Sequence, residues 1–170
     1  GVEFVSTGGT STFIEGLGYP CVAVEDLTKY PSMLGGRVKT LHPAIQGGIL
    51  ARRGHETDQK EVLEYGLSLL DLVIVDLYPF EATVASGASE EDSIEKIDSG
   101  GLSLIRGAAK NFEDVVIIPA QADYATLLEI LRERGARTTL EERRHFARRA
   151  FAVSSHYDSA IFRYFDGEER

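Results

Sequence analysis

Four short apolar runs are separated by amphipathic segments, and this alternation predicts the secondary structure of the chain. The apolar runs predict β-strands at residues 2–6, 21–25, 71–80 and 114–120. The run at 71–80 gives the clearest signal, because consecutive β-branched residues are typical of a strand that is covered on both faces. The strands are therefore expected to lie inside the molecule.

The segments between the strands show the spacing of amphipathic helices. Helices are predicted over residues 10–18, 56–66, 89–98, 102–112, 122–135 and 139–165. Thr10 or Ser11 is expected to cap the first helix and Ser89 the third. One face of the last helix carries an apolar stripe, formed by Phe146, Ala150, Val153, Tyr157 and Ile161. Residues 166–170 are expected to form a frayed end.

Strands that alternate with helices predict an α/β fold. We expect three layers, in which an open and mostly parallel sheet is covered by helices on both faces. A length of 170 residues and a hydrophobic content of 43% suit one domain with a proper core. A single domain over residues 1–170 is therefore predicted.

The chain carries a formal net charge of −9, and this charge narrows the classes of partner. Nucleic acid is not expected, because phosphate backbones are bound by basic surfaces. No apolar run reaches the length that spans a membrane, and no signal peptide is recognisable. Cys21 is the single cysteine, which excludes a disulfide framework within one chain. These features favour the cytoplasm.

Two glycine-containing motifs concentrate groups that bind anions. In GGRVKTLHP, residues 35–43, an extended backbone would place Arg37 and Lys39 on one side, where both could grip a phosphate. His42 in this motif is either a ligand contact or a packed polar residue. In STGGT, residues 6–10, a strand meets a helix whose free N–H groups can hold an anion. The simpler interpretations are a solvated surface for the first motif and a structural turn for the second.

Two further motifs carry candidate catalytic groups. Asp76 and Tyr78 lie at the end of the strand predicted at 71–80, where ligands gather in open α/β sheets. Asp98 precedes a glycine pair, and Lys110 lies near the end of the apolar helix that follows. An inward-facing Lys110 would need an acid, and Asp98 is a candidate partner at about 4 Å. The alternatives are a core tyrosine and a lysine that reaches to water.

Seven short motifs occur in an order that resembles one known family. They are STGGT, LGGRVKTLHP, GGILARR, DLYPF, TVASG, EKIDSGG and AAKNF. Their order and spacing are similar to those of the IMP cyclohydrolase domain, which forms the amino-terminal part of the bifunctional purine biosynthesis protein (AICAR formyltransferase/IMP cyclohydrolase). The resemblance covers essentially the whole chain and implies a methylglyoxal-synthase-like, Rossmann-like α/β fold.

The resemblance implies a dehydrative ring closure in de novo purine biosynthesis. In that family, the carboxamide of 5-formamidoimidazole-4-carboxamide ribonucleotide attacks the neighbouring formamido group, water leaves, and inosine monophosphate (IMP) forms. By motif, the catalytic positions are Lys39, Tyr78, Asp98 and Lys110. The nucleotide and its phosphate would be held by Thr7, Gly8, Gly9, Thr10, Arg37, Thr40, Asp76, Gly100 and Gly101.

The chemistry of this reaction suggests a role for each catalytic position. Lys110 and Tyr78 would stabilise the negative charge that grows on the formyl oxygen. Asp98 and Lys39 would move protons, one accepting from the amide and the other helping the oxygen to leave as water. The family implies no metal and no cofactor and suggests a homodimer, with neither nucleic acid nor a membrane as partner.

The chain departs from the family in several places. The strand, serine-rich loop and helix that usually precede STGGT are missing, as is the formyltransferase domain, so a truncated chain is expected. Many relatives carry Asn at the position of Asp76, and His at the positions of Gln46 and Phe112. The alternatives are a nucleotide-sensing allosteric module of the same fold, an inactive fragment, and methylglyoxal synthase itself. The paired catalytic aspartates of methylglyoxal synthase are not found in the expected glycine-rich setting.

Overall fold

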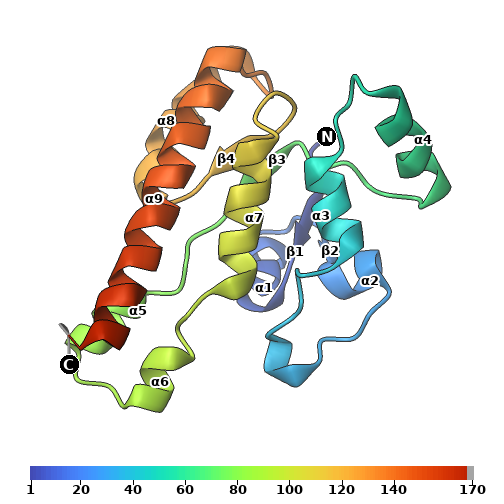
Figure 1. Ribbon diagram of the computed structural model, residues 1–170. Helices are drawn as coiled ribbons and strands as arrows, with labels where there is room; N and C mark the ends of the chain where they lie inside the picture. The colour runs from blue at the N-terminus through green and yellow to red at the C-terminus, as the bar shows by residue number, and fades with distance from the viewer. Residues whose placement is uncertain (168–170) are drawn as a thin grey trace.

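The structure is a computed structural model that describes residues 1–167 (Figure 1). The strands are β1 (Phe4–Ser6), β2 (Cys21–Ala23), β3 (Leu72–Ile74) and β4 (Val116–Ile118). The helices are α1 (Gly8–Gly16), α2 (Val24–Thr28), α3 (Pro43–Leu50), α4 (Glu56–Glu64), α5 (Phe80–Ala85), α6 (Glu90–Ile94), α7 (Ser99–Lys110), α8 (Tyr124–Arg134) and α9 (Leu140–Asp166), with the 3-10 turns η1 (Leu34–Gly36) and η2 (Gln121–Asp123). Of the end predicted to fray, residues 168–170 lie outside the described residues.

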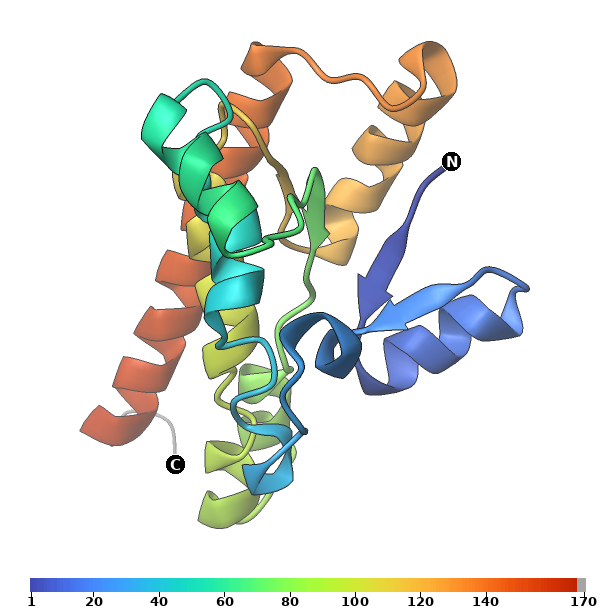
Figure 2. The ribbon, with the colours of Figure 1, turned by 90° about the vertical axis from the view of Figure 1, so that its right-hand side faces the viewer.

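The four strands form two parallel pairs. β1 pairs with β2, so that Val5 lies opposite Val22, and β3 pairs with β4, so that Val73 lies opposite Ile117. Within residues 1–167 no ladder joins the two pairs into the single sheet that the alternation predicts, and Figure 2 shows them apart. Side chains connect them instead, since Val5 packs against the main core. The α/β class and the parallel pairing are confirmed.

Helices cover the β3–β4 pair on both sides. Figure 2 shows α8 on one side and α7 with α9 on the other. The main core joins these layers, because Ile105 of α7, Phe146 of α9 and Leu127 of α8 belong to one cluster with all of β4. The layers predicted around the strands are therefore present.

β3 is shorter and less covered than its sequence predicts. Only residues 72–74 of the predicted strand 71–80 form a ladder, although the N–H of Val75 still donates to the carbonyl of Ile118 at 3.0 Å. Val73 is buried, but Leu72 is 39% and Ile74 is 48% exposed. Because side chains alternate along a strand, Leu72 and Ile74 lie on the same face. That face of β3 is partly exposed although helices lie on both sides of the pair, so the prediction that both faces are covered is wrong. The same prediction holds for β4, whose three residues are buried.

Two helices begin earlier than their patterns predict, and each begins at a glycine pair. Thr7 is the N-cap of α1, so neither Thr10 nor Ser11 has that role. Asp98 is the N-cap of α7, and its carboxylate accepts from the N–H of Gly101. A glycine pair costs helix stability, which is why the pattern places it outside the helix. Here the glycines instead let other loops approach the first turn of each helix.

The last helix matches its prediction closely. A capping box begins α9, in which Thr139 and Glu142 each satisfy a backbone N–H of the other. Within the predicted stripe Phe146, Ala150 and Tyr157 are buried. Ser89 caps α6 as predicted, by accepting from the N–H of Asp92. Among the helices of residues 1–167, none is both long and apolar enough to cross a membrane.

The sequence pattern does not predict α2, α3 or α5. α3 begins at Pro43, and the Nδ1 atom of His42 accepts from the N–H of Ala44 at 3.1 Å. His42 also lies against the ring of Tyr30, with 5.9 Å between the ring centroids. Of the two interpretations of His42, the structure therefore supports the packed polar residue.

Candidate active site

The turn between β1 and α1 meets the side chain of Lys39. Gly8 opens α1 with a φ of +49°, a conformation that favours glycine. A Cβ atom at Gly8 would lie 4.0 Å from the Nζ of Lys39, so the ammonium group stands at the start of this helix. Thr7 makes no side-chain cap, which leaves the first N–H groups of α1, at Gly9 and Thr10, for a ligand. The N-terminus of α1 and the ammonium group of Lys39 together favour the binding of an anion between them.

The loop that carries Lys39 also fixes its position. Gly36 has a φ of +85°, and a Cβ atom there would come within 2.3 Å of the Cε of Lys39. The lysine stem therefore lies across the glycine. In the part of the chain that the structure describes, no carboxylate forms an ion pair with Lys39. Its charge is available to a bound anion.

Arg37 lies at the edge of the same loop. Its backbone is helical, with a φ of −64° and a ψ of −17°. The prediction that an extended backbone places Arg37 and Lys39 on one side is therefore wrong. The guanidinium lies 3.3 Å from a carboxylate oxygen of Glu95, and both side chains are exposed. An exposed pair of this kind contributes little to stability, so a ligand can displace it at small cost.

A third loop contact brings the first turn of α7 into the site. A Cβ atom at Gly100 would lie 2.8 Å from the Oγ1 of Thr40, and one at Gly101 would lie 2.7 Å from the carboxylate of Asp98. Glycine at both positions gives these groups room. The N–H of Gly101 donates to Asp98 Oδ1 at 2.6 Å. The carboxylate is therefore held at the start of α7.

Tyr78 joins this group through its backbone. Its N–H donates to Asp98 Oδ2 at 3.4 Å, and its side chain is exposed. The Nζ of Lys96 lies 5.7 Å from the centroid of the Tyr78 ring, a distance typical of a cation–π contact. Lys96 is absent from the predicted site residues, although it lies within the motif EKIDSGG. Tyr78 and Asp98 are neighbours, as the sequence predicts.

Asp76 faces a different partner. The phenol of Tyr124 donates to Asp76 Oδ2 at 2.5 Å. Burial and the Asp76 carboxylate raise the pKa of Tyr124 to about 12. The phenol therefore stays protonated at neutral pH, and one oxygen of Asp76 is already occupied.

Lys110 lies away from Asp98. The two residues mark opposite ends of the 12-residue helix α7, which spans about 18 Å at 1.5 Å per residue. That separation is far beyond the roughly 4 Å at which charged groups pair. Lys110 is exposed. The prediction that Lys110 pairs with Asp98 is therefore wrong within one chain.

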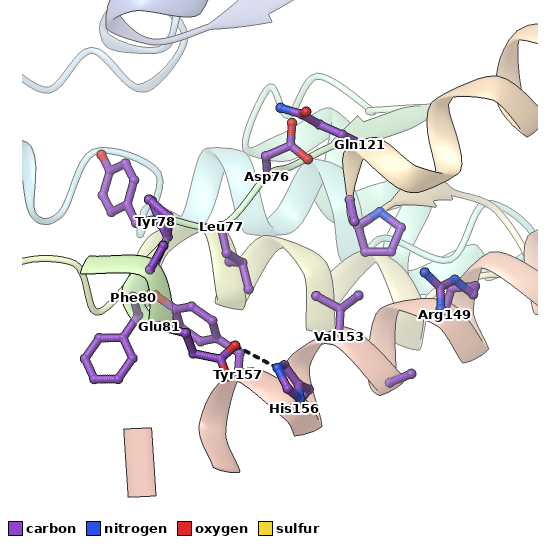
Figure 3. Close-up of a pocket in the computed structure, with 15 residues that line it drawn as sticks. Asp76, Leu77, Tyr78, Phe80, Glu81, Gln121, Arg149, Val153, His156 and Tyr157 are labelled. Carbon is purple, nitrogen blue, oxygen red and sulfur yellow. Dashed lines mark hydrogen bonds and ion pairs between the residues drawn. The ribbon is translucent and has the colours of Figure 1, made fainter. Parts of the chain in front are cut away.

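A hollow of about 620 Å³ is lined by residues 76–82, which include Asp76 and Tyr78 of the predicted site. Figure 3 shows residues of α9 along it, including Arg149, Val153 and His156. His156 lies 2.7 Å from Glu81 and Arg149 lies 2.9 Å from Asp123, while Asp76 accepts the hydrogen bond from Tyr124. Nothing in these pairs calls for a ligand. Within residues 1–167 no group of three or more His, Cys, Asp or Glu side chains is placed to hold a metal ion.

Comparison with known families decides the classification. Residues 1–103 match the family described as MGS-like domain. The chain belongs to this family. Residues 108–170 match a second description, AICARFT/IMPCHase bienzyme.

Individual relatives agree with both matches. The chain is 69% identical, over 99% of its length, to the bifunctional purine biosynthesis protein PurH of Bacteroides thetaiotaomicron. It is 47% identical, over 98% of its length, to the protein of the same name from Rhodospirillum rubrum. It spans about one third of the length of these relatives, 33% and 32%. The predicted resemblance to this family is confirmed.

A solved structure supports the fold. The structure titled "Crystal structure of ForH" superposes with a TM-score of 0.76 at 36% identity, covering 96% of this chain and 85% of that one. The MGS-like fold predicted from the motifs is therefore confirmed.

Proposed function

We propose that this chain is an IMP cyclohydrolase, which closes the purine ring of 5-formamidoimidazole-4-carboxamide ribonucleotide to give IMP and water. The two family matches and the PurH relatives support this proposal. In a longer protein of the PurH type, this activity would accompany that of an AICAR formyltransferase. The substrate is a nucleotide precursor of the purines and the product is a purine nucleotide. The lone cysteine and acidic charge suit the cytoplasm.

The observation that carries the proposal is the convergence of three segments. Lys39 reaches the start of α1 at Gly8, and Thr40 reaches the start of α7 at Gly100. The N-terminus of α1 and the Lys39 ammonium group, which has no acidic partner among residues 1–167, thus lie together beside the start of α7. A nucleotide phosphate supplies the negative charge that this arrangement favours.

We assign Asp98 and Tyr78 to the reacting end of the nucleotide. The amide nitrogen is a poor nucleophile, so holding it against the formyl carbon supplies much of the rate. The Asp98 carboxylate accepts the amide proton, and the Tyr78 phenol stabilises the oxygen that gains negative charge. Lys39 helps that oxygen to leave as water. This reaction needs no metal or redox cofactor.

The assembly we propose is a homodimer. Large apolar side chains are exposed on α9, notably Phe151, Phe162 and Phe165, and a second copy would cover such a surface. A second copy would also be needed if Lys110 takes part in the reaction, because Lys110 lies about 18 Å from Asp98 in one chain.

One observation favours a second candidate, a nucleotide-sensing module of the same fold. Such a module needs the phosphate site formed by Gly8 and Lys39, but it does not need Tyr78, Asp98 and Lys110 together. The structure separates Lys110 from the other two. Turnover distinguishes the candidates, because a sensing module binds nucleotide and leaves it unchanged.

The test measures ring closure by absorbance, with no added cofactor. The chain should convert the formylated substrate to IMP. Arg37→Ala should raise KM roughly 10- to 100-fold, the loss expected for a charged hydrogen bond of about 1.5–3 kcal/mol, and leave kcat nearly unchanged. Arg52→Ala is the matched control, since Arg52 is a similarly exposed arginine paired with Asp58. Tight binding of IMP without turnover would support the sensing module.

A further inference from the structure

A buried phenol from α9 holds the turn that leads into α7. Tyr157 is 7% exposed, and its hydroxyl makes two hydrogen bonds to backbone groups. It donates to the carbonyl of Lys96 at 2.6 Å and accepts from the N–H of Asp98 at 2.9 Å. The same oxygen thus fixes both ends of a three-residue turn.

This turn determines where the side chain of Asp98 lies. The carboxylate then accepts from the N–H groups of Gly101 at 2.6 Å and Tyr78 at 3.4 Å. The other end of the turn, Lys96, carries the ammonium group that faces the Tyr78 ring. Loosening the turn would therefore move two groups of the site at once.

The phenol is itself fixed by its surroundings. Its ring meets Phe80 edge to face, with 6.4 Å between centroids, in a cluster that includes Ile97 and Leu102. Burial raises the pKa of Tyr157 above its ordinary value, although the N–H of Asp98 works against this rise. The hydroxyl therefore keeps its proton at neutral pH and remains a donor to Lys96.

We propose that Tyr157 is a positioning residue for ring closure, which holds the Asp98 backbone so that its carboxylate lies at the reacting atoms. This inference rests on the proposed IMP cyclohydrolase function. Tyr157 does not need to touch substrate, because its effect passes through the turn at 96–98. A displacement of about 1 Å at a catalytic group can cost up to roughly 100-fold in rate, so a backbone tether of this kind is significant.

Tyr157→Phe removes only the hydroxyl, since phenylalanine keeps the ring that packs against Phe80. We expect kcat to fall by roughly 10-fold while KM stays within about twofold, because the phosphate contacts of Lys39 are untouched. Tyr164→Phe is the matched control. Tyr164 lies on the same helix and meets the same Phe80 ring at 5.5 Å. Its kcat should equal that of the unchanged chain.

Hydrogen exchange tests the bond between Asp98 and Tyr157 without substrate. In Tyr157→Phe the N–H of Asp98 loses its acceptor, so its hydrogen exchange should become faster, whereas Tyr164→Phe should leave it unchanged. Equal loss of kcat in both variants would show a general packing effect and overturn the inference. Unchanged kcat in Tyr157→Phe would also overturn it.

Asp98→Asn distinguishes failure of this inference from failure of the proposed function. If Asp98→Asn abolishes turnover while Tyr157→Phe does not change it, the function stands and the positioning role is wrong. If Asp98→Asn turns over normally, the proposed catalytic assignment is wrong. In that case the hydrogen-exchange rate of the Asp98 N–H alone tests whether Tyr157 holds the turn. An N–H that stays protected in Tyr157→Phe would show that it does not.

Discussion

The two ends of α7 show how one helix can serve chemistry at its start and stability at its finish. At the start, Asp98 caps a glycine pair that lies against Thr40, and its carboxylate meets the N–H of Tyr78. At the finish, the buried Asn111 donates to the carbonyls of Ile49 and Ala51 at 2.8 and 3.1 Å. The first end gathers groups from other loops around a space, and the second end ties α7 to α3.

Side-chain size explains much of this difference. Gly100 and Gly101 carry no Cβ, so the backbone N–H groups at the positive end of the helix can be approached closely. At the other end Ala108 and Ala109 are buried in the main core, to which α3 and α9 also contribute. Asp98 and Lys110 lie close in the sequence, but this does not place them in one site.

The largest expected effect comes from the Asp98 end. Asp98→Asn should lower kcat by roughly 10²–10⁴-fold, the range expected when a general base is lost. Asparagine can keep the N-cap bond from Gly101 but not the longer one from Tyr78, so the free energy of unfolding should fall by no more than about 1 kcal/mol. Steady-state turnover and urea denaturation measure the two quantities. A stable variant with normal kcat would show that the start of α7 only binds.

The opposite result is expected at the other end. Asn111→Ala leaves the carbonyls of Ile49 and Ala51 without their donor, which should cost about 1–3 kcal/mol of stability. kcat should remain near that of the unchanged chain at temperatures where the variant is folded. Denaturant midpoint and turnover, measured together, check this. A large loss of kcat at full stability would remove the distinction between the two ends.

Lys110 tests whether a second copy contributes to the site. Lys110 is exposed, so Lys110→Ala should change kcat by no more than about twofold in a site built from one chain. If kcat instead collapses, Lys110→Ala and Asp98→Asn chains should be mixed. Recovery of turnover on mixing would mean that Lys110 of one copy serves Asp98 of another.

The smallest effect concerns Asp76, whose partner Tyr124 has a pKa raised to about 12 by burial and by the carboxylate. Because the folded-state pKa lies above the ordinary value of about 10, the protonated phenol stabilises the fold below pH 10. This contribution is lost as the pH rises towards 12. Tyrosinate absorbance should show a late-titrating phenol, besides Tyr157, that is absent in Tyr124→Phe. In Asp76→Asn that phenol should titrate earlier, and an unchanged titration would contradict the pairing.

Local sequence predicted the elements whose signals lie within one segment. The stripe through Phe146 and Tyr157 predicted α9 without help from the rest of the chain. The strands were placed correctly but too long. The pattern at 71–80 predicts a covered strand, and the coverage of Leu72 and Ile74 depends on neighbours that lie elsewhere in the chain.

The sequence by itself determined the family and the α/β class, because motif order and hydrophobic spacing are written along the chain, and it proposed the residues of the candidate site. Only the tertiary structure decided which motif residues meet. It placed Lys39 on Gly8 and Asp98 beside Tyr78, and it gave Asp98 a tether from Tyr157, 59 positions away. It also separated Lys110 from Asp98, since 12 residues of helix hold their ends about 18 Å apart. Distance along the chain carries no such information until the backbone between two residues has folded.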